Sequence, residues 1–169
     1  MSRVLTTGKA AAAGNVRPNA TLELVLARLA IAAGVAITLV GLTDVGLLWY
    51  PPQFGNTEWE FGNLSDTFGS LSLTTLGFGL LAAGVITRGS KLALYVLGAM
   101  FAFFTLATLG ALALFALNLP VAFRGTPAAL RTTVILIMAK NAVLALTYVM
   151  LYGYFAVASF KQAQRLKKP

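Results

Sequence analysis

The sequence contains no cysteine and no histidine. Without cysteine it has no disulfide and no thiol nucleophile, and without either residue it lacks the ligands of Cys/His zinc sites and of haem held by imidazole or thiolate. Histidine is also the commonest general base near neutral pH. We therefore expect no enzyme activity, no catalytic residues, no metal site and no ligated cofactor, while contact with a lipid or pigment stays open.

Charged residues are also scarce, at 11% of the chain against about 25% in soluble domains. Hydrophobic residues make up 58%, and the mean hydropathy is +0.80. Such a chain cannot cover a water-facing surface, so a lipid bilayer is the expected solvent. The net charge is +8, but the basic residues gather in the tails and one short loop, which favours membrane topology over nucleic-acid binding.

What the chain does have is a series of long apolar runs. A spanning helix needs about 20 apolar residues, and four are predicted, at about 22–49, 71–87, 92–119 and 127–160. Pro120 is expected to end the third helix, and Thr126-Pro127 to begin the fourth. The fold class is thus an all-α integral membrane protein. A transmembrane domain of residues 21–160 lies between a flexible basic tail, 1–20, and a second basic tail, 161–169.

The segment 49–68 is the longest interruption between these runs, and it holds both tryptophans and three of the five acidic residues. Residues 57–60 fit a T-x-x-E capping box, and Phe61, Leu64 and Phe68 then share one helical face. This pattern predicts a short amphipathic helix on the outward membrane surface, between the first and second spans. Its candidate contacts with a partner protein are Trp59, Glu60 and Phe61.

Small residues on the first two spans indicate close helix packing. Gly34 and Gly41 are seven residues apart, so they share a face of the first helix. The second span is rich in glycine, alanine, serine and threonine, which favours a place inside a bundle or against another chain. The candidate partner contacts on it are Gly77, Gly79, Ala83 and Gly84.

The basic residues predict the orientation. Ten of the thirteen basic residues fall on one side of the membrane. They are Arg28, the loop residues Arg88 and Lys91, and the basic residues of the two tails. Only Arg124 and Arg131 fall on the other side. Cytoplasmic loops carry this excess, so both termini are expected in the cytoplasm of a bacterium, with the protein in its inner membrane and the segment 49–68 facing outward.

Two ionisable residues, Asp44 and Lys140, fall inside predicted spans, where a charge costs about 2.5–3.5 kcal/mol on insertion scales. Both lie toward the outward side, so an ion pair between the first and fourth helices is one hypothesis. Snorkelling or contact with a partner or lipid is a second, and an ion or proton pathway is a third. Glu58, Glu60 and Asp66 do not follow the spacing of a calcium loop.

The run Pro51-Pro52-Gln53-Phe54, followed by Glu58-Trp59-Glu60-Phe61, resembles the HpsJ-like membrane proteins of cyanobacteria. The matching positions are Asn56, Trp59, Glu60 and Phe61, and the resemblance covers roughly residues 40–81. It implies a shared first helical pair and an association with polysaccharide secretion. In this sequence the lead into the second helix has no basic residue and no proline, unlike the family pattern.

The functional hypothesis that fits these features is a small, non-catalytic accessory or scaffolding subunit of a larger bacterial membrane complex, whether photosynthetic, respiratory or secretory. A component of envelope polysaccharide export is the alternative that the resemblance implies. A small transporter or channel is a third.

Overall fold

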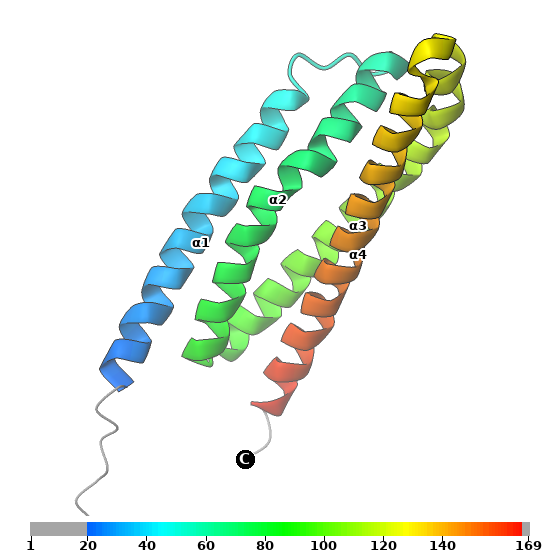
Figure 1. Cartoon of the computed structure of the whole chain (residues 1–169). Coiled ribbons are helices and arrows are strands. Elements are labelled where there is room, and N and C mark those ends of the chain that lie inside the picture. The colour runs from blue at the N-terminus through cyan, green and yellow to red at the C-terminus, as the bar shows by residue number, and fades with distance from the viewer. Residues whose placement is uncertain (1–19, 167–169) are drawn as a thin grey trace, which may run out of the picture.

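The computed structural model describes residues 20–166 and is built from four long helices (Figure 1). These are α1 (Ala20–Leu48), α2 (Thr57–Arg88), α3 (Lys91–Gly125) and α4 (Arg131–Arg165), with one 3-10 turn, Ala128–Leu130, before α4. Each helix is long and apolar enough to cross a membrane. The predicted all-α class with four spans is therefore confirmed, and the chain is a multi-pass membrane protein in contact with lipid. The expected tail 1–20 lies almost wholly outside the described residues.

The predicted boundary between an interfacial helix and the second span is wrong, because α2 is one continuous helix of 32 residues. Gly62 and Gly69 lie inside this helix, where a glycine costs only about 1 kcal/mol. Packing of this segment against α3 outweighs that cost, since the Phe61 and Phe68 rings both contact Phe115. The amphipathic segment is the beginning of α2.

Pro120 does not end α3, which continues to Gly125. Proline removes one backbone hydrogen bond, and here the loss falls close to the end of the helix. The end of the helix is closed by Thr126, whose Oγ1 donates to the Ala122 carbonyl oxygen at 2.8 Å and whose backbone N–H donates to the Phe123 carbonyl oxygen at 3.3 Å. Pro127 precedes the 3-10 turn, so the fourth helix begins about where the sequence predicts.

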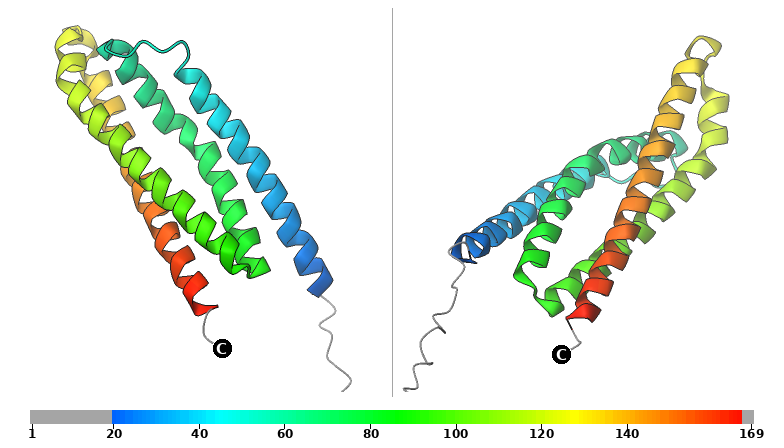
Figure 2. Two further views of the ribbon diagram at one scale, coloured as in Figure 1. Left: turned by 180° about the vertical axis from the view of Figure 1, so that it is seen from behind. Right: turned by 60° about the horizontal axis from the view of Figure 1, so that its bottom comes forward.

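The helices form an open arrangement and not a closed four-helix bundle. In the described part of the chain α1 contacts α2 alone, whereas α2 also contacts α3 and α4, and α3 and α4 pack along each other. Figures 1 and 2 show α1 on one flank, α2 in the middle and the α3–α4 hairpin on the other flank. One broad face of α1 and α2 is consequently left uncovered.

Aromatic side chains fill the contact between α2 and the hairpin. Tyr152 and Phe101 are fully buried, and Phe78 is almost fully buried. The Phe78 ring centre lies 5.6 Å from that of Phe101 and 5.9 Å from that of Tyr152. The Tyr152 hydroxyl and Thr75 Oγ1 are 2.6 Å apart and share a hydrogen bond. This aromatic core fixes α2 against α3 and α4.

Candidate functional site

Four glycines form the contact between α1 and α2, and we call this contact the glycine seam (Gly34, Gly41, Gly77 and Gly84). A Cβ atom on Gly84 would lie 2.7 Å from the Ala27 carbonyl oxygen, and one on Gly77 would lie 2.6 Å from the Thr38 backbone nitrogen. Neither neighbour can move aside, because both are backbone atoms. The close approach expected at Gly34 and Gly41 is confirmed. Gly77 and Gly84 contact α1 and not a partner chain, which corrects their predicted role.

Three aromatic rings close the junction between α1 and α2, and we call them the aromatic cap (Trp49, Phe54 and Trp59). The ring centres of Trp49 and Trp59 are 5.4 Å apart, edge to face, and Phe54 lies 5.8 Å from Trp59. The Trp49 indole Nε1 donates to Thr67 Oγ1 at 3.0 Å. Trp59 is thus half-buried within its own chain, and its role as a partner contact stays a prediction.

Glu60 and Asn56 link this junction to the rest of the molecule. Glu60 Oε1 accepts the Gly55 backbone N–H at 2.8 Å, and its other oxygen accepts from Asn118 Nδ2 of α3 at 3.3 Å. The N-cap of α2 is Asn56, whose side-chain oxygen accepts the Trp59 backbone N–H at 3.2 Å. The predicted cap at Thr57 is therefore one residue off. Asparagine caps a helix at least as well as threonine, which explains the shift.

Phe61, the third predicted partner contact, also packs internally. Its ring stacks on that of Phe115 with centres 5.0 Å apart and planes inclined by 13°. Below it, Asn141 of α4 is buried and its side-chain amide donates to Ser65 Oγ of α2. The end of the molecule that contains the loop 49–56 and the turn 126–130, here called the loop end, is therefore held by polar and aromatic contacts.

Glu60→Ala should destabilise the protein by about 1–3 kcal/mol, because a charged acceptor with two donors is removed and the Gly55 and Asn118 groups lose their partner. The matched control is Glu58→Ala, since Glu58 is exposed and lies two residues earlier in the same helical turn. Thermal unfolding in detergent measures both. Equal melting temperatures for the two variants would contradict the structural role of Glu60.

Asp44 and Lys140 are not brought together. α1 and α4 do not touch in the described chain, and both side chains are exposed. Gly41 faces Thr74, so Asp44 is level with about residue 71 of α2, whereas Asn141 beside Lys140 meets Ser65. Along α2, the levels of Asp44 and Lys140 therefore differ by about seven residues, which is ~10 Å along the helix axis.

The direction of the two side chains widens this separation. Helical side chains lean toward the N-terminus, and α1 runs toward the loop end while α4 runs away from it. Asp44 therefore leans away from the loop end and Lys140 leans toward it. Lys140 is nearly level with the Trp49–Thr67 hydrogen bond, at the aromatic boundary and not deep in a span. The depth argument for an ion pair within one chain is wrong for this reason.

Gly79 and Ala83 are the two predicted contacts that the fold leaves open. A Cβ on Gly79 would meet nothing within 4 Å, and Ala83 is exposed. Ala83 borders a hollow of about 240 Å³ together with Leu26 and Ala30 of α1. Asp44 lies 18 residues after Leu26, which is five full helical turns, so it shares that side of α1. We call this surface the open face (Leu26, Asp44, Gly79 and Ala83).

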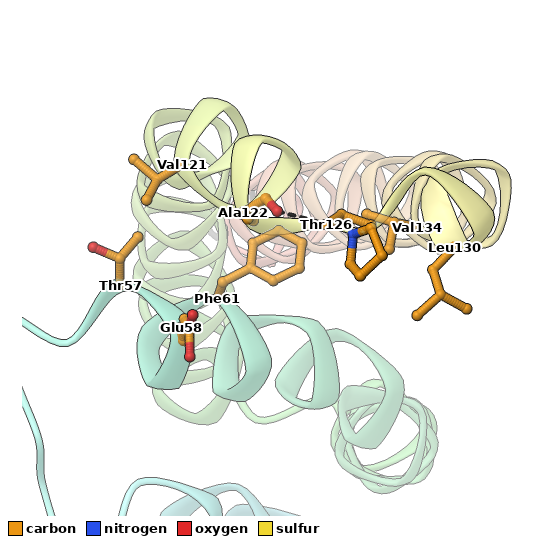
Figure 3. Close-up of a pocket in the computed structure, with 10 residues that line it drawn as sticks. Thr57, Glu58, Phe61, Val121, Ala122, Thr126, Leu130 and Val134 are labelled. Carbon is orange, nitrogen blue, oxygen red and sulfur yellow. Dashed lines mark hydrogen bonds between the residues drawn. The ribbon is translucent and has the colours of Figure 1, made fainter.

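A second hollow, of about 300 Å³, lies at the loop end between the start of α2 and the α3–α4 turn. Figure 3 shows Phe61 below Ala122 and Thr126, with Glu58 at the edge. Thr126 Oγ1 already donates to the Ala122 carbonyl oxygen at 2.8 Å. This hollow presents mainly apolar groups, and no three acidic side chains are grouped to hold a metal within residues 20–166.

Comparison with protein-family models, with curated proteins and with solved structures finds no match for the chain.

Proposed function

We propose that the protein is a non-catalytic accessory or scaffolding subunit of a larger membrane complex, and that a transmembrane helix of its partner packs on the open face. The observation that carries the proposal is Asp44, an exposed carboxylate about 7.5 Å inside Trp49, counted at 1.5 Å per residue. A charge in a span costs about 2.5–3.5 kcal/mol unless it is paired. A lysine, arginine or amide donor on a partner helix would offset that cost.

The rest of the open face suits a helix as well. Gly79 and Ala83 are four residues apart, and small residues at this spacing let two helix backbones approach closely in lipid. Because α1 touches no helix except α2 within residues 20–166, a further helix could lie against both without displacing a contact described there. The partner is therefore recognised by a smooth surface with Asp44 toward the loop end and Glu23 at the opposite end, beside the hollow.

The orientation belongs to the same proposal. The excess of basic residues at the end of the molecule with Arg88, Lys91 and Lys161 favours that end as cytoplasmic. The aromatic cap and the α3–α4 turn would then face outward, and the membrane would be the inner membrane of a bacterium.

The test is purification of the tagged protein from its native membrane in mild detergent, with quantitative mass spectrometry of what comes with it. The expected result is stoichiometric recovery of a larger complex. Asp44→Leu should lower that recovery about tenfold or more, because a cation on the partner would lose its counter-ion. Ala83→Leu should also lower the recovery of the complex, because the larger side chain would keep a partner helix from approaching the open face closely.

Asp66→Asn is the control, since Asp66 is an exposed acidic residue of α2 outside the open face. Recovery with this variant should equal that of the wild type. A wild-type protein that is purified alone, or an Asp44→Leu variant that keeps its partner in full, would refute the proposal.

Polysaccharide export is the second candidate function. It is favoured by the positions of the four residues that match the HpsJ-like family. Of the four residues that carry the HpsJ-like resemblance, Trp59, Glu60 and Phe61 join α2 to neighbouring segments, and Asn56 caps the start of α2. Recovery of glycosyltransferase or export proteins in the same purification would favour this reading over a photosynthetic or respiratory complex.

A further inference from the structure

An apolar groove lies at the opposite end of the molecule, where α2 turns into α3 at residues 89–90. We call this end the turn end. The groove has a volume of about 370 Å³, and apolar side chains form most of its wall, among them Leu81, Val85, Val96, Leu97 and Met100. Ser90 is the one polar side chain in the wall. The volume of the groove is within the range of about 300–1,000 Å³ that is usual for small-molecule sites.

Basic side chains stand around this groove. Arg88 follows Val85 by three residues and Leu81 by seven, so it lies on the side of α2 that forms the wall. Lys91 begins α3 directly after Ser90, at the level of the polar end of the groove, although its helical position is on the other side of α3 from Ala93, Val96 and Leu97. Both side chains are exposed. Arg88 thus lies beside the groove, and Lys91 adds a positive charge at the same level.

Arg28 of α1 adds a third cation on the same side. Leu26 of α1 and Ala83 of α2 border the hollow on the open face. Arg28 lies two residues after Leu26, and Val85 lies two residues after Ala83. Two residues correspond to a rotation of about 200° around a helix. Both are therefore on the opposite flank of the α1–α2 pair, where the groove lies. Gly84 meets Ala27, so Arg28 is also near the level of Arg88.

We propose that this groove binds an anionic phospholipid, with an acyl chain along Leu81, Val85 and Met100 and the phosphate near Arg88, Lys91 and Arg28. Lipid is the occupant that the surroundings supply to an apolar groove on a membrane-spanning helix pair. Basic pockets between spanning helices select anionic headgroups, and each cation near the surface contributes attraction. Long basic side chains reach the headgroup level while their stems remain in the apolar layer.

Two further features fit this occupant. Ser90 Oγ accepts the Ala93 backbone N–H at 3.5 Å, and within residues 20–166 its hydroxyl hydrogen has no protein acceptor, so it can donate to a phosphate oxygen. The one acidic side chain in the described part of this end, Glu23, borders the hollow on the other flank, with Leu26 and Ala83. The groove side is therefore purely cationic.

The experiment reconstitutes the full chain in nanodiscs of phosphatidylcholine mixed with phosphatidylglycerol, extracts it in mild detergent, and counts retained lipids by native mass spectrometry. The wild type should retain phosphatidylglycerol and little phosphatidylcholine. The double variant Arg88→Gln, Lys91→Gln should bind phosphatidylglycerol about thirtyfold more weakly. Arg124→Gln, Arg131→Gln at the loop end is the matched control and should retain the lipid as the wild type does.

A third variant separates the acyl-chain contact from the charges. Val96 is 61% exposed in the groove wall, so Val96→Trp should fill the groove without disturbing the core and should lower retention with all cations present. Equal retention of the two lipids by the wild type would overturn the proposal, and so would unchanged retention in the Arg88, Lys91 double variant. Neither result depends on whether a protein partner occupies the open face.

Discussion

Gly77→Leu is expected to separate α1 from α2. A Cβ at Gly77 would lie 2.6 Å from the Thr38 backbone nitrogen and 2.9 Å from the Gly34 carbonyl oxygen, so a leucine must push the two backbones apart. Overpacking in a tight core costs about 1–3 kcal/mol. The cost here should reach the upper end of that range, because the Thr38 nitrogen and the Gly34 oxygen belong to the backbone and cannot rotate away.

The measurement uses the absence of native cysteine, which makes an introduced pair specific. Ala30→Cys and Ala83→Cys place one thiol on each helix at the same hollow. Oxidation should join them in the otherwise native chain and fail when Gly77→Leu is added. Gly79→Leu, two residues away on the same helix, is the control, since a Cβ there meets nothing within 4 Å. Equal cross-linking in both backgrounds would show that the seam does not hold α1.

Tyr152→Ala is expected to loosen the α3–α4 hairpin from α2, with a loss of about 3 kcal/mol in unfolding free energy. Its side chain is fully buried and contacts Phe78, Phe101 and Phe104. Removing a large aromatic from a core costs about 3–5 kcal/mol in water-soluble proteins. The lower end applies because lipid and core are similarly apolar, so mainly packing is lost.

Two comparisons make this prediction specific. Tyr152→Phe keeps the ring and loses only the hydrogen bond to Thr75, so it should cost about 1 kcal/mol. Tyr154→Ala removes a tyrosine that is 69% exposed on the same helix and should leave stability nearly unchanged. Unfolding in detergent, followed by the fluorescence of Trp49 and Trp59, ranks the three. A Tyr154→Ala variant as unstable as Tyr152→Ala would refute the core position.

The helix inventory follows from properties of single segments. Run length and hydropathy fix the four spans. The predicted ends of the first helix, the end of the second and the start of the third are within two residues of the structure, whereas α2 begins at Thr57 and not near residue 71. The predicted helix end at Pro120 is wrong, since Pro120 lies inside α3. Gly62 likewise lies inside α2, because packing between helices can outweigh the cost of a single unfavourable residue.

The contacts of Trp59, Glu60 and Phe61 could not be predicted from local sequence. An aromatic or acidic residue at the membrane boundary looks the same whether it faces a partner or its own chain. The tertiary structure brings Trp49, from the end of α1, and Phe115 and Asn118, from α3, to these residues. Only that assembly shows that the three side chains are already engaged.

The sequence by itself determined that this is a multi-pass helical membrane protein that contains neither cysteine nor histidine. The tertiary structure alone decided which small residues on α2 are in contact with α1. Gly77, Gly79 and Gly84 are equivalent in composition and helix propensity, but α1 lies against Gly77 and Gly84 and not against Gly79. The physical reason is that hydropathy is a property of one helix, whereas a packing face is set by the register and rotation of two.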